Sequence, residues 1–276
     1  MRRLIGAVAL SLAAAYAHAA AGTIEILADV ASPQLKNSRA LRIYYPPGYK
    51  DHPTRRYPVI YMHDGQNLFD PKTAAFGVAW DIGATIDRLI AAGRMEEVIV
   101  VGIDNTADRI AEYTPCCDPE HGGGKLAQYE AFIVDTIKPL IDRKLRTRPQ
   151  REYTAIMGSS LGGVASVAIA QHRPDLFSMA AGVSSSFWWN ERAMIKQLPA
   201  RLPVRFYIDA GTIDDGLADT EAMRDAMLAK GYVDGIDLLF YAAPGGRHNE
   251  ASWAARVDKA LTWFFPRKAA DTDRAH

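Results

Sequence analysis

The stretch over residues 153–163 constrains the fold more than any other part of the sequence. An apolar run with the character of a β-strand ends at Gly158, and helical residues begin directly after Ser160. In such a strand–turn–helix the turn is so tight that the residues two before and two after its central Ser should lack a Cβ. Gly158 and Gly162 meet that demand for Ser160, whereas larger side chains flank Ser159. The pattern therefore predicts Ser160 as a nucleophile presented at the end of a strand.

Strand and helix patterns alternate along the chain without an internal repeat. Besides the strand before Ser160, runs of β-branched and aromatic residues predict strands at Thr23–Val30, Ala40–Tyr45, Tyr57–Met62, Val98–Ile103, Ala180–Ser185, Val204–Ala210 and Leu238–Ala242. Helical stripes lie between most of them, with a kink expected at Pro139 and one final helix from Trp253 to Phe264. This alternation predicts one doubly wound α/β domain, with a mostly parallel sheet of about eight strands and helices on both faces. The first two strands are expected to be antiparallel at one edge.

The N-terminus has the three parts of a secretory signal peptide. A short basic segment precedes the apolar residues 4–16, and an Ala-x-Ala site ends at Ala19. We expect a signal peptide over residues 1–19, a single domain over 20–267 and a flexible tail over 268–276, with a periplasmic or secreted mature protein. An uncleaved anchor is the alternative. No later segment reaches the length of apolar residues that a membrane span needs.

Charge and cysteine content exclude several classes of protein. The chain has 32 basic and 32 acidic side chains, and loss of Arg2 and Arg3 with the signal peptide leaves a formal charge of −2 (30 − 32). That balance does not indicate a nucleic-acid partner. The two cysteines, Cys116 and Cys117, are neighbours, so they cannot staple distant segments. Reduced thiols, a vicinal bridge and intermolecular pairing stay open. No His-Glu-x-x-His motif or Cys/His cluster is present, so we predict neither a metal nor a cofactor.

Residues beyond the carboxyl ends of the strands are the candidates for catalysis. A Ser hydroxyl needs a base that takes its proton and a carboxylate that orients the base. Six of the seven histidines lie in the signal segment, at the terminus, or away from the predicted base position. His248 follows the last strand and keeps the chain order nucleophile, acid, base. Asp214 and Asp215 both follow the strand over 204–210, and only one of two neighbouring side chains can face His248.

The tetrahedral intermediate of acyl transfer needs backbone N–H donors. One is expected at Leu161, directly after the nucleophile. The other is expected in the loop that follows the strand over 57–62, at Gln66, because Gly65 lets the chain turn close to the site. An ordinary polar turn over residues 63–67 is the alternative.

Several motifs recur together in one known family. They are Ile-Tyr-Met-His-Asp-Gly-Gln-Asn-Leu-Phe at residues 60–69, Arg109 with Glu-Tyr-Thr-Pro at 112–115, the glycines over 158–163, residues 184–189, and the Gly-Gly-x-His that ends at His248. From about Arg42 to Phe265 the chain resembles the Putative esterase family. That family holds carbohydrate esterase family 1 (feruloyl and acetylxylan esterases), S-formylglutathione hydrolases, enterobactin-type siderophore esterases and mycolyltransferases.

The resemblance implies an α/β-hydrolase fold without a large lid domain. It also implies a triad of Ser160, Asp214 and His248, since in relatives with a Gly-Thr-x-Asp turn the acid is the third residue after the Gly. Asp215 would then point outward or cap the next helix. No substrate is implied, because the family's substrates are diverse.

Six residues near the predicted site are candidates for substrate binding: Asp64, Gly65, Arg109, Tyr113, Trp188 and Trp189. Arg109 and Tyr113 lie in a long irregular stretch over 104–124, of the kind that forms functional rims. A salt bridge of Arg109 with Glu112 or a neighbour is the alternative. Trp188 and Trp189 either line an acyl pocket or belong to the core.

The sequence thus predicts an exported serine carboxylic-ester hydrolase that works through an acyl-enzyme. Its expected substrate is a small-molecule or carbohydrate-linked ester, for example an acylated carbohydrate or a siderophore. An acyltransferase on the same scaffold is one alternative. A catalytically silent carbohydrate- or siderophore-binding protein is another, against which the intact Ser, Asp and His argue. The oligomeric state is left open.

Overall fold

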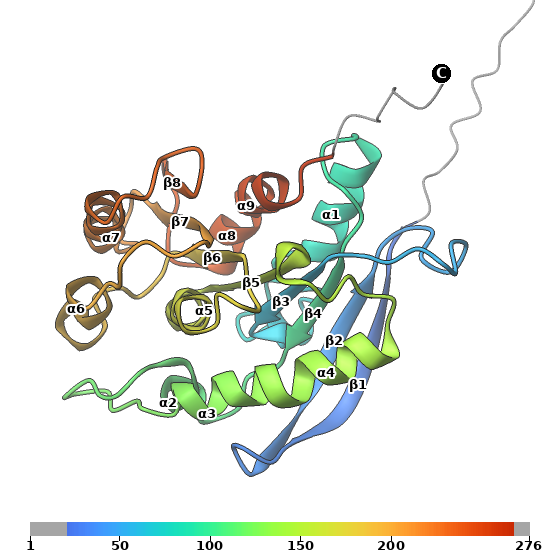
Figure 1. Cartoon of the computed structure of the whole chain (residues 1–276), viewed down its shortest axis with the longest axis horizontal. Helices are drawn as coiled ribbons and strands as arrows, with labels where there is room; N and C mark the ends of the chain where they lie inside the picture. Colours follow the sequence, from blue (N-terminus) through green and yellow to red (C-terminus); the bar gives the residue numbers. More distant parts are fainter. Residues whose placement is uncertain (1–20, 268–276) are drawn as a thin grey trace, which may run out of the picture.

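A computed structural model describes residues 21–267, and a single twisted sheet runs through them (Figure 1). The predicted signal segment over 1–19 and the tail over 268–276 lie outside the described residues. The strands are β1 (Thr23–Ser32), β2 (Asn37–Tyr45), β3 (Val59–His63), β4 (Ile99–Ile103), β5 (Thr154–Ser159), β6 (Met179–Val183), β7 (Arg205–Gly211) and β8 (Leu238–Ala243). Their spatial order is β1-β2-β4-β3-β5-β6-β7-β8.

The pairing of the strands confirms the predicted sheet. β1 pairs antiparallel with β2, and β2 pairs antiparallel with β4. From β4 to β8 all neighbours are parallel. The fold is therefore a mostly parallel α/β sheet of eight strands in the described part of the chain, with the antiparallel pair at one edge. No lid domain is present among residues 21–267.

Helices cover both faces of this sheet. They are α1 (Ile82–Ala91), α2 (Arg109–Tyr113), α3 (Leu126–Ala131), α4 (Lys138–Lys144), α5 (Leu161–His172), α6 (Trp189–Lys196), α7 (Leu217–Ala229), α8 (Glu250–Ala254) and α9 (Val257–Phe264). Figure 1 shows α1 and α9 on one side of the sheet and α3 and α4 on the other. Within residues 21–267, none of the helices has the length and apolar character needed to cross a bilayer.

The alternation of side chains along the buried strands creates two cores. On β3, Val59 and Tyr61 pack with α3, α4 and α5, while Ile60 and Met62 pack with α1 and α9. Each side chain is essentially inaccessible to solvent. Both faces are apolar because a parallel sheet in this architecture is covered on both sides.

Three local features differ from the simple expectation or refine it. The kink predicted at Pro139 appears as a π-helical segment over Phe132–Ile137, because proline lacks the N–H that would bond to residue 135. The stretch over 104–124 contains the short helix α2. The single final helix is in fact two, α8 and α9, with Arg256 in a non-helical conformation between them.

The candidate active site

Ser160 occupies a strained turn between β5 and α5. Its φ of 57° and ψ of −124° lie outside the regions that L-residues favour, a conformation that costs about 1–3 kcal/mol and is maintained by its surroundings. A Cβ added to Gly158 would lie 2.7 Å from the backbone of Gly162, so the strand end does not tolerate a larger residue, and a Cβ on Gly162 would lie within 3.2 Å of the His63 side chain. The Ser160 N–H donates to the Val183 carbonyl of β6, which anchors the turn. The local geometry thus agrees with the sequence prediction.

A cavity of about 710 Å³ opens at this turn. Ser159, Ser160 and His248 line it together with Asn249, Glu250, Ala251 and Trp253, the polar Asp64, Asn67, Asn105 and Arg109, and the apolar Ala75, Phe76 and Val78. Parallel strands bring their carboxyl ends to one edge of a sheet, which is why residues so distant in sequence meet here.

His248 pairs with Asp215, and the expectation that it pairs with Asp214 is wrong. The His248 Nδ1 lies 2.7 Å from Asp215 Oδ1, and the Asp215 side chain is fully buried. The Asp214 side chain is 93% exposed and lies 3.8 Å from a guanidinium nitrogen of Arg247. The expectation that Asp215 points outward or caps α7 is equally wrong, since Gly216 is the N-cap residue.

The turn after β7 explains why Asp215, and not Asp214, faces His248. Asp214 has a left-handed φ of 49°, so the chain reverses there and turns the next side chain inward. Asp215 Oδ2 then accepts the backbone N–H of Gly211. A Cβ on Gly211 would lie 2.2 Å from the backbone of Gly246, so these two glycines let the β8 loop pack directly on the end of β7. That close approach brings His248 to the acid.

Hydrogen bonds hold Asp215 in its ionised form. Burial opposes the charge, but donors from His248, Ser184 and Gly211 outweigh it and lower the pKa of Asp215 below its ordinary value. The Trp253 ring stands edge-on to the imidazole of His248, with centroids 5.2 Å apart. The His248 side chain is still 40% exposed, so one ring face stays open to the cavity.

The Ser160 hydroxyl makes its hydrogen bond with Ser186 Oγ, at 3.2 Å. Ser160 and His248 thus share the cavity, while the hydroxyl is turned to the β6 side. In enzymes without substrate, catalytic hydrogen bonds are often long or poorly aligned and tighten only when substrate is bound.

The turn after β3 holds the two residues predicted around the second oxyanion donor. Residues Gly65–Asn67 form a 3₁₀ turn in which Asn67 N–H donates to the Asp64 carbonyl. Gly65 packs against β4, where a Cβ would lie 2.7 Å from the Gly102 backbone. The Gln66 side chain accepts the N–H of Asn105 at 3.1 Å. Gln66 is not among the described residues that line the cavity, so its role remains a prediction.

Asp64 and Arg109 face the cavity, but they bind each other. The guanidinium donates to both carboxylate oxygens at 2.7 and 2.8 Å, so the predicted salt bridge of Arg109 is formed with a neighbour in space. Glu112 instead pairs with the buried Arg39. Burial opposes the charge of Asp64, yet Arg109 outweighs it and lowers the pKa of that carboxyl. Tyr113 is fully buried beneath Arg109, and its hydroxyl accepts the Asp64 N–H.

His63 lies beneath the Ser160 turn and has no access to the cavity. It is 2% exposed, and its Nδ1 lies 2.9 Å from the Tyr129 hydroxyl. Its Nε2 is buried without a hydrogen-bond partner in the described structure. Burial lowers the pKa of His63 to about 4, so the ring is neutral and serves packing.

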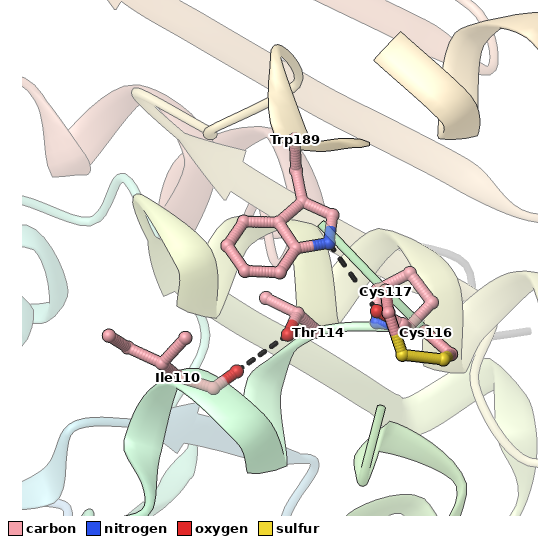
Figure 2. Close-up of a disulfide and its surroundings, with 6 residues drawn as sticks. Ile110, Thr114, Cys116, Cys117 and Trp189 are labelled. Carbon is pink, nitrogen blue, oxygen red and sulfur yellow. Dashed lines mark hydrogen bonds between the residues drawn. A yellow bond between two sulfur atoms is a disulfide. The ribbon is translucent and has the colours of Figure 1, made fainter. Parts of the chain in front are cut away.

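Trp189 lies close to Cys116 and Cys117 (Figure 2), and its ring contacts that of Trp188. Trp189 is buried, and its Nε1 donates to the Pro115 carbonyl at 3.4 Å. Trp188 is 42% exposed and contacts the ring of His121. Neither is among the described residues that line the cavity, so Trp189 belongs to the core and Trp188 to the exposed surface beside it. Cys116 and Cys117 form the vicinal disulfide that was one of the open alternatives.

Several residues of the site escape sequence reasoning. Phe76 and Val78 form the apolar wall of the cavity from a loop with no helix or strand pattern. Arg256 has the position of a surface residue in a helical stripe but is buried and contacts Asp215. Asn105, by contrast, is among the residues that the sequence places at the carboxyl ends of the strands, because it follows a buried strand at the same sheet edge.

Residues 32–264 match the family described as Putative esterase. The chain is a carboxylic ester hydrolase of this family. It is 22% identical over 246 residues to the uncharacterized protein YbbA of Bacillus subtilis, covering 83% of this chain and 93% of YbbA. It is 26% identical over 260 residues to the iron(III) enterobactin esterase of Dickeya dadantii, covering 86% of this chain. The chain spans only 54% of that relative's length.

Two solved structures have the same fold. A ferulic acid esterase superposes with a TM-score of 0.70 at 21% identity, covering 89% of this chain and 98% of its own. The enterobactin esterase FES of Shigella flexneri superposes with a TM-score of 0.67 at 18% identity, covering 88% of this chain and 58% of its own.

Proposed function

We propose that this chain is a serine esterase in which Ser160 is the nucleophile, His248 the general base and acid, and Asp215 the residue that orients His248. The observation that carries the proposal is the meeting of three chain segments at one cavity. The Ser160 turn and His248 both line it, and Asp215 Oδ1 holds the imidazole from behind at 2.7 Å. These placements support a Ser–His–Asp triad, which is recognised by the roles of its residues rather than by their sequence positions.

The hydrogen bond to Asp215 selects the useful tautomer of His248. With its proton on Nδ1, the ring presents the Nε2 lone pair to the cavity. The Ser160 hydroxyl turns from Ser186 to His248, gives up its proton and forms the new C–O bond at the ester carbonyl. Collapse of the tetrahedral intermediate breaks the bond to the alcohol, which takes the proton from His248. Water then attacks the acyl-enzyme by the same sequence and regenerates Ser160.

Two backbone donors stabilise the oxyanion in this proposal. Leu161 N–H stands at the start of α5, where the first N–H groups of a helix have no partner within the helix. Gln66 N–H is the second proposed donor, in a turn whose Asp64 and Asn67 N–H groups already bond to Tyr113 and Asp64. Loss of one such donor typically costs about 10²–10³ in kcat.

The cavity suits an ester with one apolar and one polar part. Phe76 and Val78 offer exposed apolar surface at one wall, while Asp64, Asn105 and Arg109 are polar at another. The mutual pairing of Asp64 and Arg109 leaves that wall neutral, so hydrogen-bonding groups suit it better than a free charge. An acylated carbohydrate or a siderophore ester meets this description, and relatives named as feruloyl and siderophore esterases support it.

We further propose that the protein is exported and that cleavage follows Ala19. The basic, apolar and Ala-x-Ala segments of the N-terminus support this. The first residue of the mature protein, read from periplasm or culture medium, is expected at or near Ala20. An intact N-terminus in the membrane fraction would contradict it.

A fluorophosphonate probe with peptide mapping tests the nucleophile. We expect the label on Ser160 and no label in Ser160→Ala, while Ser159→Ala, the adjacent control, is labelled. A label on Ser159 would overturn the assignment. Product analysis with added alcohols separates hydrolysis from acyl transfer, since a transferase forms a new ester in place of the free acid.

A further inference from the structure

A buried ionic cluster lies directly behind Asp215, on the side away from His248. It contains a second carboxylate, Asp209 of β7, and one guanidinium, Arg256, which lies between α8 and α9. One terminal nitrogen of Arg256 lies 3.1 Å from an oxygen of each carboxylate. Leaving a buried charge unpaired is strongly destabilising, so this arrangement is tightly constrained.

Ser184 connects the members of the cluster, and its hydroxyl has only one acceptor to which it can donate. Its hydroxyl oxygen accepts from Trp253 Nε1 at 2.9 Å and from Arg256 Nη2 at 2.5 Å, which occupies both lone pairs. The hydroxyl proton therefore goes to Asp215 Oδ2, at 2.6 Å. This bond holds the carboxylate in the plane in which its other oxygen meets His248.

Asp209 is surrounded by donors as well. Its oxygens accept from the Tyr207 hydroxyl at 2.8 Å, from the Ser184 N–H at 3.1 Å and from Arg256. Burial raises the pKa of Asp209, and Arg256 opposes this. Because every partner presents a hydrogen to it, Asp209 is the ionised member of a pair with Arg256.

The sum of these charges has a consequence for the reaction. Asp209 and Asp215 contribute −2 and Arg256 contributes +1, so the cluster carries −1 while His248 is neutral. When His248 takes the proton of Ser160, the total becomes zero. The charges of the cluster and His248 therefore sum to zero in the transition state but not in the ground state. Such a difference stabilises the transition state more than the ground state, which is what catalysis requires.

We propose that Arg256 and Asp209 are positioning residues that set the charge behind Asp215 so that it is balanced only when His248 is protonated. This rests on the proposed role of His248 as the base. The other charged or titratable groups around the histidine are Glu250 on the cavity wall, the exposed pair of Asp214 and Arg247, the pair of Asp64 and Arg109 across the cavity, and Tyr207 behind Asp209. None of these residues is substituted in the variants below.

Two single substitutions are expected to move the protonation midpoint of His248 in opposite directions. Asp209→Asn removes a negative charge, and we expect the midpoint to fall by about one pH unit. Arg256→Met removes the positive charge, and we expect it to rise by a similar amount. The double variant restores the total of −1 and should return the midpoint to near that of the unaltered protein. A purely structural role predicts no such opposition of sign.

Two readouts measure the midpoint, and the second does not depend on the proposed reaction. The first is the acidic limb of the kcat/KM–pH profile, and the second is an NMR titration of the His248 ring in the Ser160→Ala background. If the unaltered protein shows no esterase activity, the proposed function fails, while the NMR titration still tests the cluster. If the single variants move the NMR midpoint in the same direction, or not at all, the inference is overturned.

A matched control is provided by another buried ion pair. Arg39 and Glu112 are equally buried, with side chains 1% and 0% exposed, and contact neither His248 nor Asp215. Arg39→Met should lower stability while leaving the midpoint unchanged. If Arg256→Met fails to fold, Asp209→Asn, which is nearly isosteric, decides the matter by itself, since an unchanged midpoint there contradicts the proposal.

Discussion

Two regions flank the Ser160 turn, and both contain a histidine, an aspartate, an arginine and a tyrosine. On the β7 side, His248 is bound to Asp215, and Arg256 lies behind the acid. On the β3 side, His63 is bound to Tyr129. There the neighbouring carboxylate, Asp64, is bound by Arg109 instead.

The difference between the two regions lies in which partner the carboxylate takes and in whether the ring reaches solvent. His248 has a buried carboxylate on one nitrogen and a half-open ring, so it can accept and return a proton. His63 is sealed beneath the turn, and burial disfavours its charged form. The same set of residue types therefore makes the proposed base in one place and a packing element in the other.

The same substitution should affect kcat very differently at the two histidines. His248→Gln is expected to lower kcat by about 10⁵-fold or more, since loss of the base disables the whole triad. His63→Gln should keep kcat within about tenfold in the folded fraction, because the ring does not reach the cavity. Steady-state rates corrected for folded protein measure both. Comparable losses in kcat would remove the distinction between the two regions.

The two adjacent carboxylates sharpen the comparison on the β7 side. Asp215→Asn should lower kcat by about 10⁴-fold, as loss of this acid does in the chymotrypsin-type enzymes, because it leaves the wrong tautomer. Asp214→Asn should change kcat by less than about threefold, since its side chain is 93% exposed. The pair of rate measurements decides it. Two small effects would indicate a Ser–His dyad without an essential acid.

The buried state of His63 predicts a pH dependence of stability. Its pKa is about 4 in the folded chain, against about 6.5 for an unfolded histidine. Between these values the unfolded chain binds a proton that the folded chain does not. The contribution of His63 to the free energy of unfolding is therefore fully present above about pH 6.5. It is lost toward pH 4, which lowers the free energy of unfolding by roughly 3 kcal/mol.

Urea unfolding at several pH values measures that slope, with His63→Gln as the control. The control should lose most of the slope between pH 4 and 6.5, whatever its absolute stability. An unchanged slope would mean that His63 titrates normally and is not sealed.

The smallest effect is expected in the aromatic cluster beside the vicinal disulfide. Trp188→Ala should change kcat/KM by no more than about threefold, because Trp188 lies outside the cavity-lining residues of the described chain. The matched change Phe76→Ala, on the cavity wall, should raise KM more for esters with a large apolar part. If Trp188→Ala has the larger effect, the substrate extends over that cluster.

The sequence by itself determined the features that local physics dictates. The Ser160 turn follows from two glycines at the required spacing between a strand and a helix. The existence and order of the strands and the antiparallel edge follow from the apolar runs, although most strand ends shift by one to three residues. The position of His248 at the site was predictable because it comes after the last strand, and parallel strands end at a common edge of the sheet. Each inference needs only residues close together along the chain.

Only the tertiary structure decided which side chains meet. Asp214 and Asp215 are chemically identical neighbours, and the left-handed φ of Asp214 turned one outward and the other toward His248. Arg256 became a partner of Asp215 because the final helix breaks at that residue. Such contacts join β7 to a loop and a helix break more than 30 residues away in sequence, and no periodicity encodes them. They depend on backbone angles that are set by close packing, such as that of Gly211 on Gly246.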